Sequence, residues 1–124
     1  MGIEEILKNC SESFLKSELF GIIIIDKEYN IVWHNDKFSK EYTDGRCVVG
    51  DKCYQALGDE KPHAECPTRA SLQKNVSTKQ LIIRDNSYFV SMAFPVSDGY
   101  AAHIYSAFDK GKIDVVEEIM DCQV

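Results

Sequence analysis

The sequence lacks the features of several common functional classes. Its longest apolar run, Leu19–Ile25, has only seven residues, whereas a helix that spans a membrane needs about 20. Its 14 basic residues are outnumbered by 20 acidic ones, and the net charge at pH 7 is -6. A surplus of acidic groups argues against a surface for binding nucleic-acid phosphates. We therefore predict no membrane span in this chain and no nucleic-acid partner.

Motifs of catalysis and of export are absent as well. The sequence contains no phosphate-binding glycine loop, no Gly-x-Ser-x-Gly elbow and no His-Glu-x-x-His helix. Cys53 and His63 could act as nucleophile and base, but no pattern in the sequence orients the His. The first residues, Met-Gly-Ile-Glu-Glu, are acidic where a signal peptide would be basic. We expect a cytoplasmic protein that is not an enzyme.

What the sequence does contain is typical of one small globular domain. It has 124 residues, of which 44% are hydrophobic and 27% charged, the usual balance of a folded protein. Apolar residues recur at steps of three and four over 3–19, which predicts an amphipathic helix. The β-branched run 20–25, the polar turn 26–30 and the run 31–34 predict a hairpin.

The remainder of the chain alternates between short helices and strands. Asn35 or Asp36 is placed to cap a short helix that carries Phe38 and Tyr42. Pro67 suits the first position of a second helix. Beyond these we predict short helical turns over 43–65, three strands between 79 and 108 with turns at 85–87 and 97–99, and a helix over 110–120. The fold class is therefore α+β, an antiparallel five-stranded sheet with helices on one face.

Two segments resemble the PAS (Per-Arnt-Sim) family of sensory domains. The hairpin Gly21–Asp26 and Ile31–Asn35, followed by Phe38, is similar to the opening of that family. The segment Val49–Tyr54 holds a Gly-x-x-Cys-Tyr pattern, and Cys66-Pro67 follows. This pair resembles a subset of bacterial and archaeal PAS sensors that carry Cys-x-x-Cys-Pro, although His63 here replaces the first Cys of that motif.

The resemblance implies an architecture and a role. It implies the strand order 2-1-5-4-3, a PAS domain over 20–109, an N-terminal flanking helix over 1–19 and a C-terminal helix over 110–124 that passes the signal on. It also implies a sensory module of the two-component type, often linked to a histidine kinase or another output partner. PAS domains share a fold rather than a ligand, so the chemistry stays open.

A ligand pocket is the first candidate site. The resemblance implies a cavity between the sheet and the small helices, suited to a small-molecule ligand. The same large apolar residues are also those expected to fill the core. The candidate pocket residues are Ile23, Ile25, Trp33, Phe38, Tyr42, Leu57, Phe89 and Phe94.

Cysteine and histidine form the second candidate site. Cys47, Cys53, His63 and Cys66 could hold zinc or an iron–sulfur cluster, but they are separated by five, nine and two residues, without the paired spacing of a structural zinc site. A helix that begins at Pro67 would favour a thiolate at Cys66, which suggests a thiol redox sensor. Alternatively, Cys47 and Cys53 are small buried hydrophobes.

Two further hypotheses concern haem and the terminal helices. A haem would need an axial ligand such as His34 or His103, while the Asn-Cys-Arg segment of flavin-binding relatives is absent. The apolar stripes of both terminal helices suggest contacts between chains. We expect a homodimer that forms through the N-terminal helix.

Overall fold

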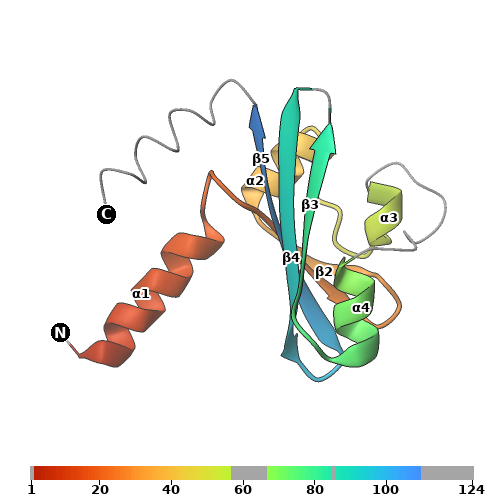
Figure 1. Ribbon diagram of the computed structural model, residues 1–124. Coiled ribbons are helices and arrows are strands. Elements are labelled where there is room, and N and C mark those ends of the chain that lie inside the picture. The colour runs from red at the N-terminus through yellow and green to blue at the C-terminus, as the bar shows by residue number, and fades with distance from the viewer. Residues whose placement is uncertain (1, 57–66, 85, 110–124) are drawn as a thin grey trace.

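The computed structural model describes residues 2–56, 67–84 and 86–109. The first and last strands pair at the centre of one antiparallel sheet with the order β2-β1-β5-β4-β3, which is the order that the resemblance implies. The elements in chain order are α1 (Ile3–Leu15), β1 (Gly21–Asp26), β2 (Ile31–His34), α2 (Asp36–Tyr42), α3 (Cys53–Ala56), α4 (Pro67–Lys74), β3 (Thr78–Arg84), β4 (Ser87–Ser97) and β5 (Tyr100–Asp109) (Figure 1).

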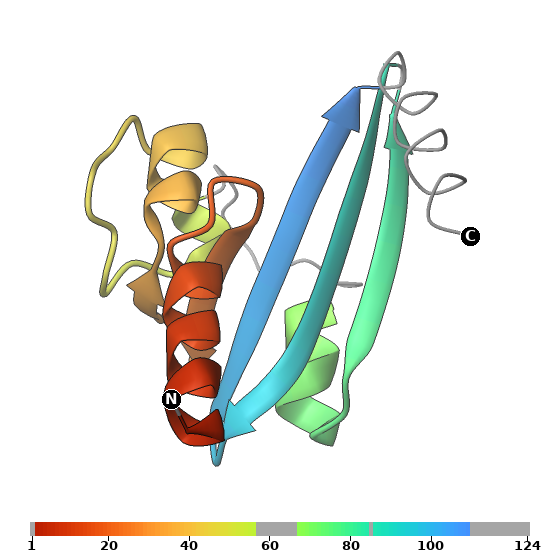
Figure 2. The same cartoon turned by 90° about the vertical axis from the view of Figure 1, so that its left-hand side faces the viewer.

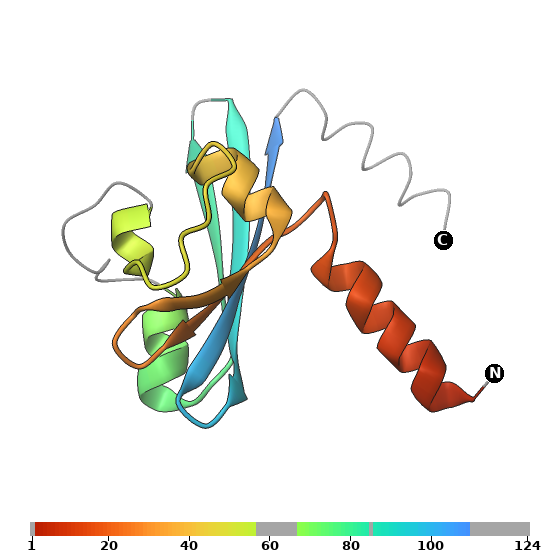
Figure 3. The same ribbon diagram turned by 180° about the vertical axis from the view of Figure 1, so that it is seen from behind.

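Different helices cover the two faces of the sheet. Helices α3 and α4 lie on one side of the sheet and α1 lies on the other, as Figures 1 and 3 both show. Helix α2 packs against β1, and its Phe38 joins Ile23 and Ile25 in the buried core. We call the face covered by α2, α3 and α4 the inner face and the opposite face the outer face.

The hairpin of β1 and β2 is closed by Asp26. Its carboxylate accepts hydrogen bonds from the backbone N–H groups of Glu28, at 3.0 Å, and Asn30, at 2.9 Å. The side-chain amide of Asn30 donates to the second carboxylate oxygen at 3.1 Å. Burial alone raises the pKa of Asp26, but these hydrogen bonds outweigh it and hold the pKa below its usual value. The turn therefore keeps its charge and its shape at neutral pH.

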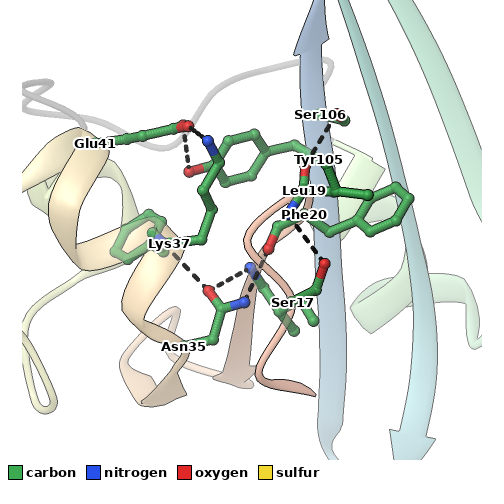
Figure 4. Close-up of polar contacts among 10 residues, drawn as sticks. Ser17, Leu19, Phe20, Asn35, Lys37, Glu41, Tyr105 and Ser106 are labelled. Atoms are coloured by element: carbon green, nitrogen blue, oxygen red, sulfur yellow. Dashed lines mark hydrogen bonds and ion pairs between the residues drawn. The ribbon is translucent and has the colours of Figure 1, made fainter. Parts of the chain in front are cut away.

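Asn35 is the N-cap of α2, one of the two positions expected from the sequence. Its Oδ1 accepts from the backbone N–H of Phe38 at 3.1 Å and from that of Ile22 at 3.0 Å. Its Nδ2 donates to the carbonyl of Phe20 at 2.8 Å (Figure 4). Since Asn35 is 4% exposed, one buried amide joins α2, β1 and the segment that leads from α1.

The ends of the helices refine the sequence predictions. Pro67 opens α4 as expected, whereas α1 ends at Leu15 and not at residue 19. The chain turns there, because the hydroxyl of Ser17 accepts from the N–H of Leu19 and the hydroxyl of Ser106 donates to the carbonyl of Leu19, both at 3.0 Å. The predicted helix over 110–124 lies outside the described residues. No helix in the described ranges is long and apolar enough to cross a membrane.

We expect Asn35→Ala to lower the free energy of unfolding by about 3 kcal/mol, because it removes a helix cap and leaves buried backbone groups without partners. Urea unfolding followed by the fluorescence of Trp33 measures this change. Asn9→Ala, at an exposed position of α1, is the control and should change stability little. Equal effects of the two substitutions would contradict the role given to Asn35.

Candidate functional site

The inner face gathers five of the residues predicted to line a pocket. Ile23, Ile25 and Phe38 belong to the buried core cluster, and Phe89 packs against it. The ring of Tyr42 lies 5.3 Å from that of Phe38, measured between centroids. The described residues therefore place these side chains together between the central strands and α2.

The remaining three predicted pocket residues do not join this group. Trp33 pairs with Ile24 across β1 and β2, and Phe94 pairs with Ala102 across β4 and β5. Successive residues of a strand point to opposite faces, so Ile24 faces away from Ile23 and Ile25. Trp33 and Phe94 consequently lie on the outer face. Leu57 lies outside the described residues.

Tyr105 is the centre of the inner face, although the sequence patterns did not single it out. Its ring stacks on Phe89, with centroids 5.4 Å apart and planes at 16°. It also makes edge contacts with Tyr42 at 5.4 Å and Phe38 at 6.5 Å. Gly21 lies opposite on β1, where a Cβ would overlap the ring of Tyr105. The sequence offered one signal for this arrangement, a glycine at the start of the first strand that leaves space for a large ring on the strand beside it.

The hydroxyl of Tyr105 ties the sheet to α2. It donates to Glu41 Oε2 at 2.9 Å, and the Glu41 carboxylate also forms an ion pair with Lys37 (Figure 4). Burial raises the pKa of Tyr105 well above its usual value, and the hydrogen bond to Glu41 and its negative charge raise it further. Tyr105 is therefore a neutral donor that couples the central strand β5 to α2.

Only part of the predicted cysteine and histidine set is described. Cys47 is exposed, whereas Cys53 is half-buried and packs against the core. The backbone N–H of Cys53 donates to the carbonyl of Tyr29 at 2.8 Å, which ties α3 to the hairpin. His63 and Cys66 lie outside the described residues, and the described ranges hold no group of three potential metal ligands. Zinc or cluster binding by the four residues stays a prediction.

The two histidines considered for haem differ in their surroundings. His34 Nδ1 donates to the carbonyl of Asn35 at 3.1 Å, and its Nε2 accepts from the N–H of Val48 at 3.4 Å. Both nitrogens of this ring therefore contact backbone groups. His103 pairs with Ile23 and so lies on the inner face, with its ring centroid 6.3 Å from that of Tyr105. The haem hypothesis stays a prediction.

Comparisons with known proteins identify the fold through solved structures. No protein-family model matches the sequence, and neither does any curated protein. Among solved structures, the PAS domain of a protein from Colwellia psychrerythraea matches with a TM-score of 0.60 and 17% identity, covering 85% of this chain and 98% of that chain. The chain has a PAS fold.

Two other solved structures agree with this assignment. The PAS domain of nitrogen regulation protein NR(II) from Vibrio parahaemolyticus matches with a TM-score of 0.54 and 9% identity, over 80% of this chain and 96% of that chain. The photoactive yellow protein domain of the sensor histidine kinase Ppr from Rhodospirillum centenum matches with a TM-score of 0.53 and 13% identity, over 85% and 92%. Such identities establish the PAS fold alone.

Removal of the Tyr105 hydroxyl should change how the stability of this PAS fold depends on pH. Folding raises the pKa of Tyr105, so the stability linked to it is complete below the unfolded pKa of about 10 and is lost as the pH rises further. Tyr105→Phe should lower the free energy of unfolding at pH 7 by about 1 kcal/mol. It should also make the alkaline loss of stability less steep.

The control for this experiment is Tyr100→Phe, at an exposed position of the same strand. Urea unfolding at several pH values between about 7 and 11 brackets the unfolded pKa of tyrosine and measures both variants. The Tyr100→Phe protein should keep the steep alkaline loss of the unmodified chain. A Tyr105→Phe protein with that same steep loss would contradict the assignment.

Proposed function

We propose that this chain is a sensory domain in signal transduction. A small ligand bound between the inner face and the small helices would shift the balance between two arrangements of those helices, and the terminal segments would pass this shift to an output partner. The support comes from the PAS fold and from similar solved structures that are domains of sensor histidine kinases, one from Rhodospirillum centenum and one from Geobacter sulfurreducens. A ligand acts by favouring one of two existing states.

One observation carries the proposal, namely the contact between Tyr105 and Glu41. It joins α2, at the edge of the candidate site, to β5, the central strand that leads toward the C-terminus. Asn35 supplies a second connection, from the start of α2 to Phe20 and so toward α1. A displacement of α2 therefore has direct hydrogen-bonded routes to both segments that leave the sheet.

A chimeric kinase tests whether the chain transmits a signal. Residues 1–124 would replace the PAS domain of a histidine kinase, with autophosphorylation as the measurement. Tyr105→Phe should change the autophosphorylation rate at least about twofold, because substitutions on a coupling route alter it by about 0.5–2 kcal/mol. Tyr100→Phe is the matched control and should leave the rate unchanged. If neither substitution alters the rate, Tyr105 is not part of the route.

We further propose that the protein forms a homodimer through α1. No residue of α1 is buried, and its apolar side chains stay exposed, for example Ile3 at 67% and Leu7 at 59%. Ile3, Leu7, Cys10 and Phe14 follow one another at steps of four, three and four residues. This spacing forms the apolar seam of a two-helix coiled coil. A second copy of α1 fits such a seam because the pattern is complementary to itself.

A charge on the seam should separate the copies. Leu7→Lys should give a monomer by size-exclusion chromatography with light scattering, because it places an ammonium group in the apolar contact. Glu12→Lys introduces the same group on the opposite side of α1, and this variant should remain a dimer. A monomeric unmodified protein, or a Leu7→Lys protein that remains a dimer, would overturn the proposal.

A further inference from the structure

The buried side of α4 carries hydroxyl groups where an apolar contact is expected. Thr68 and Ser71 are three residues apart and so share one side of the helix. Both are only 1% exposed. Their hydroxyl oxygens are buried and have no hydrogen-bond partner among the described residues. A buried polar group without a partner destabilises the protein, so this pair requires an explanation.

The hydroxyls of Ser39 on α2 and of Thr43, the C-cap of α2, do have hydrogen-bond partners. The Oγ of Ser39, a residue 5% exposed, donates to the carbonyl of Arg46 at 2.8 Å. The Oγ1 of Thr43 donates to the carbonyl of Ser39, four residues earlier, at 2.9 Å. Hydroxyls in helices commonly bond to such preceding carbonyls. The hydroxyls of α4 therefore differ from those of α2, although both helices cover the same face.

The sheet opposite α4 presents short side chains. Helix α4 packs against β3, β4 and β5, and Figure 2 shows it behind β3 and β4. On the inner face of β4, Ser91 is 1% exposed and Ala93 is 0% exposed, and Ala101 on β5 is also fully buried. Apart from His103, which pairs with Ala93, small residues thus line this part of the face, whereas rings fill the part next to α2.

The charge of the inner face restricts what could bind there. Every buried polar residue of the described ranges is uncharged: Asn35, Ser39, Thr68, Ser71 and Ser91. A charged ligand would therefore lose its hydration without gaining a fully buried charged partner, which is strongly unfavourable. The two imidazoles on this face, those of His34 and His103, are only half-buried. A neutral ligand with hydroxyl, amide or carbonyl groups meets no such penalty, because hydroxyls both donate and accept.

We propose that the contact between α4 and the sheet is the closed form of a binding site for a small uncharged polar molecule. Such a molecule would form hydrogen bonds with Thr68 and Ser71, and Ser91 offers a third hydroxyl. Because the oxygens of Thr68 and Ser71 are shielded in this form, α4 moves away from the sheet when the ligand enters. The inference rests on the proposed sensory function and adds the chemical class of its ligand.

The first experiment tests whether the hydroxyls of α4 lack partners in the ligand-free protein. The protein is unfolded, dialysed and refolded, and the midpoint of thermal unfolding, Tm, is measured. Thr68→Val and Ser71→Ala should leave Tm unchanged or raise it. The controls, Ser39→Ala on α2 and Thr43→Val at its C-cap, should lower Tm by several degrees, because each removes a hydrogen bond. A fall in Tm for Thr68→Val as large as that for Thr43→Val would overturn the proposal.

The second experiment tests the class of ligand. Acetamide and propane-1,2-diol are the neutral probes, and acetate and lactate are their charged counterparts. In NMR titrations, the neutral probes should shift backbone amide signals of α4 and β4. Their Kd should rise at least about tenfold in the Thr68→Val, Ser71→Ala double variant, the loss expected for a hydrogen bond or two. The carboxylates should cause no comparable shifts.

Three results of the titrations would overturn the inference. They are no shift with either neutral probe, equal shifts with the carboxylates, and unchanged binding by the double variant. These failures are separable from failure of the proposed function, since the chimeric kinase tests transmission without any ligand. If Tyr105→Phe changes the activity of the chimera but neither neutral probe shifts the NMR signals, the sensory function is supported and the ligand class is wrong.

Discussion

The side-chain amide of Asn35 fixes the position of α2 above the sheet. One oxygen accepts backbone N–H groups from β1 and from α2, while the nitrogen donates to the carbonyl of Phe20. An aspartate of the same size has no donor at neutral pH, so it could not make all three bonds. Because the amide is buried, these bonds have no competition from water. The contact of Glu41 with Tyr105, later in α2, depends on this placement.

The strand order places the connections to the two terminal segments on neighbouring strands. Strands β1 and β5 lie side by side at the centre of the sheet, so the segment from α1 enters and the segment beyond Asp109 leaves from neighbouring strands. The inner face of this pair contacts the small helices. The outer face of the sheet leaves large apolar side chains exposed at the edge strand β3, such as Ile83 at 60%. The proposed change at the inner face would thus reach both connections through two adjacent strands.

Local chemistry made the elements predictable, but it did not determine which way the strands face. The cap at Asn35 and the helix start at Pro67 follow from short-range hydrogen bonding and from the missing N–H of proline. The run 22–25 contains four isoleucines and therefore no polar alternation to mark its inner side. Only the pairing of Trp33 with Ile24 reveals that Trp33 lies on the outer face.

Two features of the candidate site were hidden for related reasons. Both sides of the last strand mix small, polar and aromatic residues, so the central role of Tyr105 emerges only from its contacts with Phe89 and Glu41. Thr68 and Ser71 resemble the solvent-exposed side of a helix in the sequence, because serine and threonine are mostly exposed in proteins. Both are buried on a helix that packs on strands distant in the sequence, and no local pattern encodes such packing.

The inner face therefore combines an aromatic part and a hydroxyl-bearing part, and one pair of residues joins them. Ser91 on β4 lies directly opposite Tyr105 on β5, and Tyr105 holds Glu41 of α2. A ligand that separates α4 from β4 would change the packing beside this pair, so α2 could respond without any change in strand order. A fold shared at 9–17% identity does not specify a ligand. We therefore propose that the hydroxyls of α4 select the ligand and that the contact of Tyr105 with Glu41 carries the effect of binding to the rest of the domain.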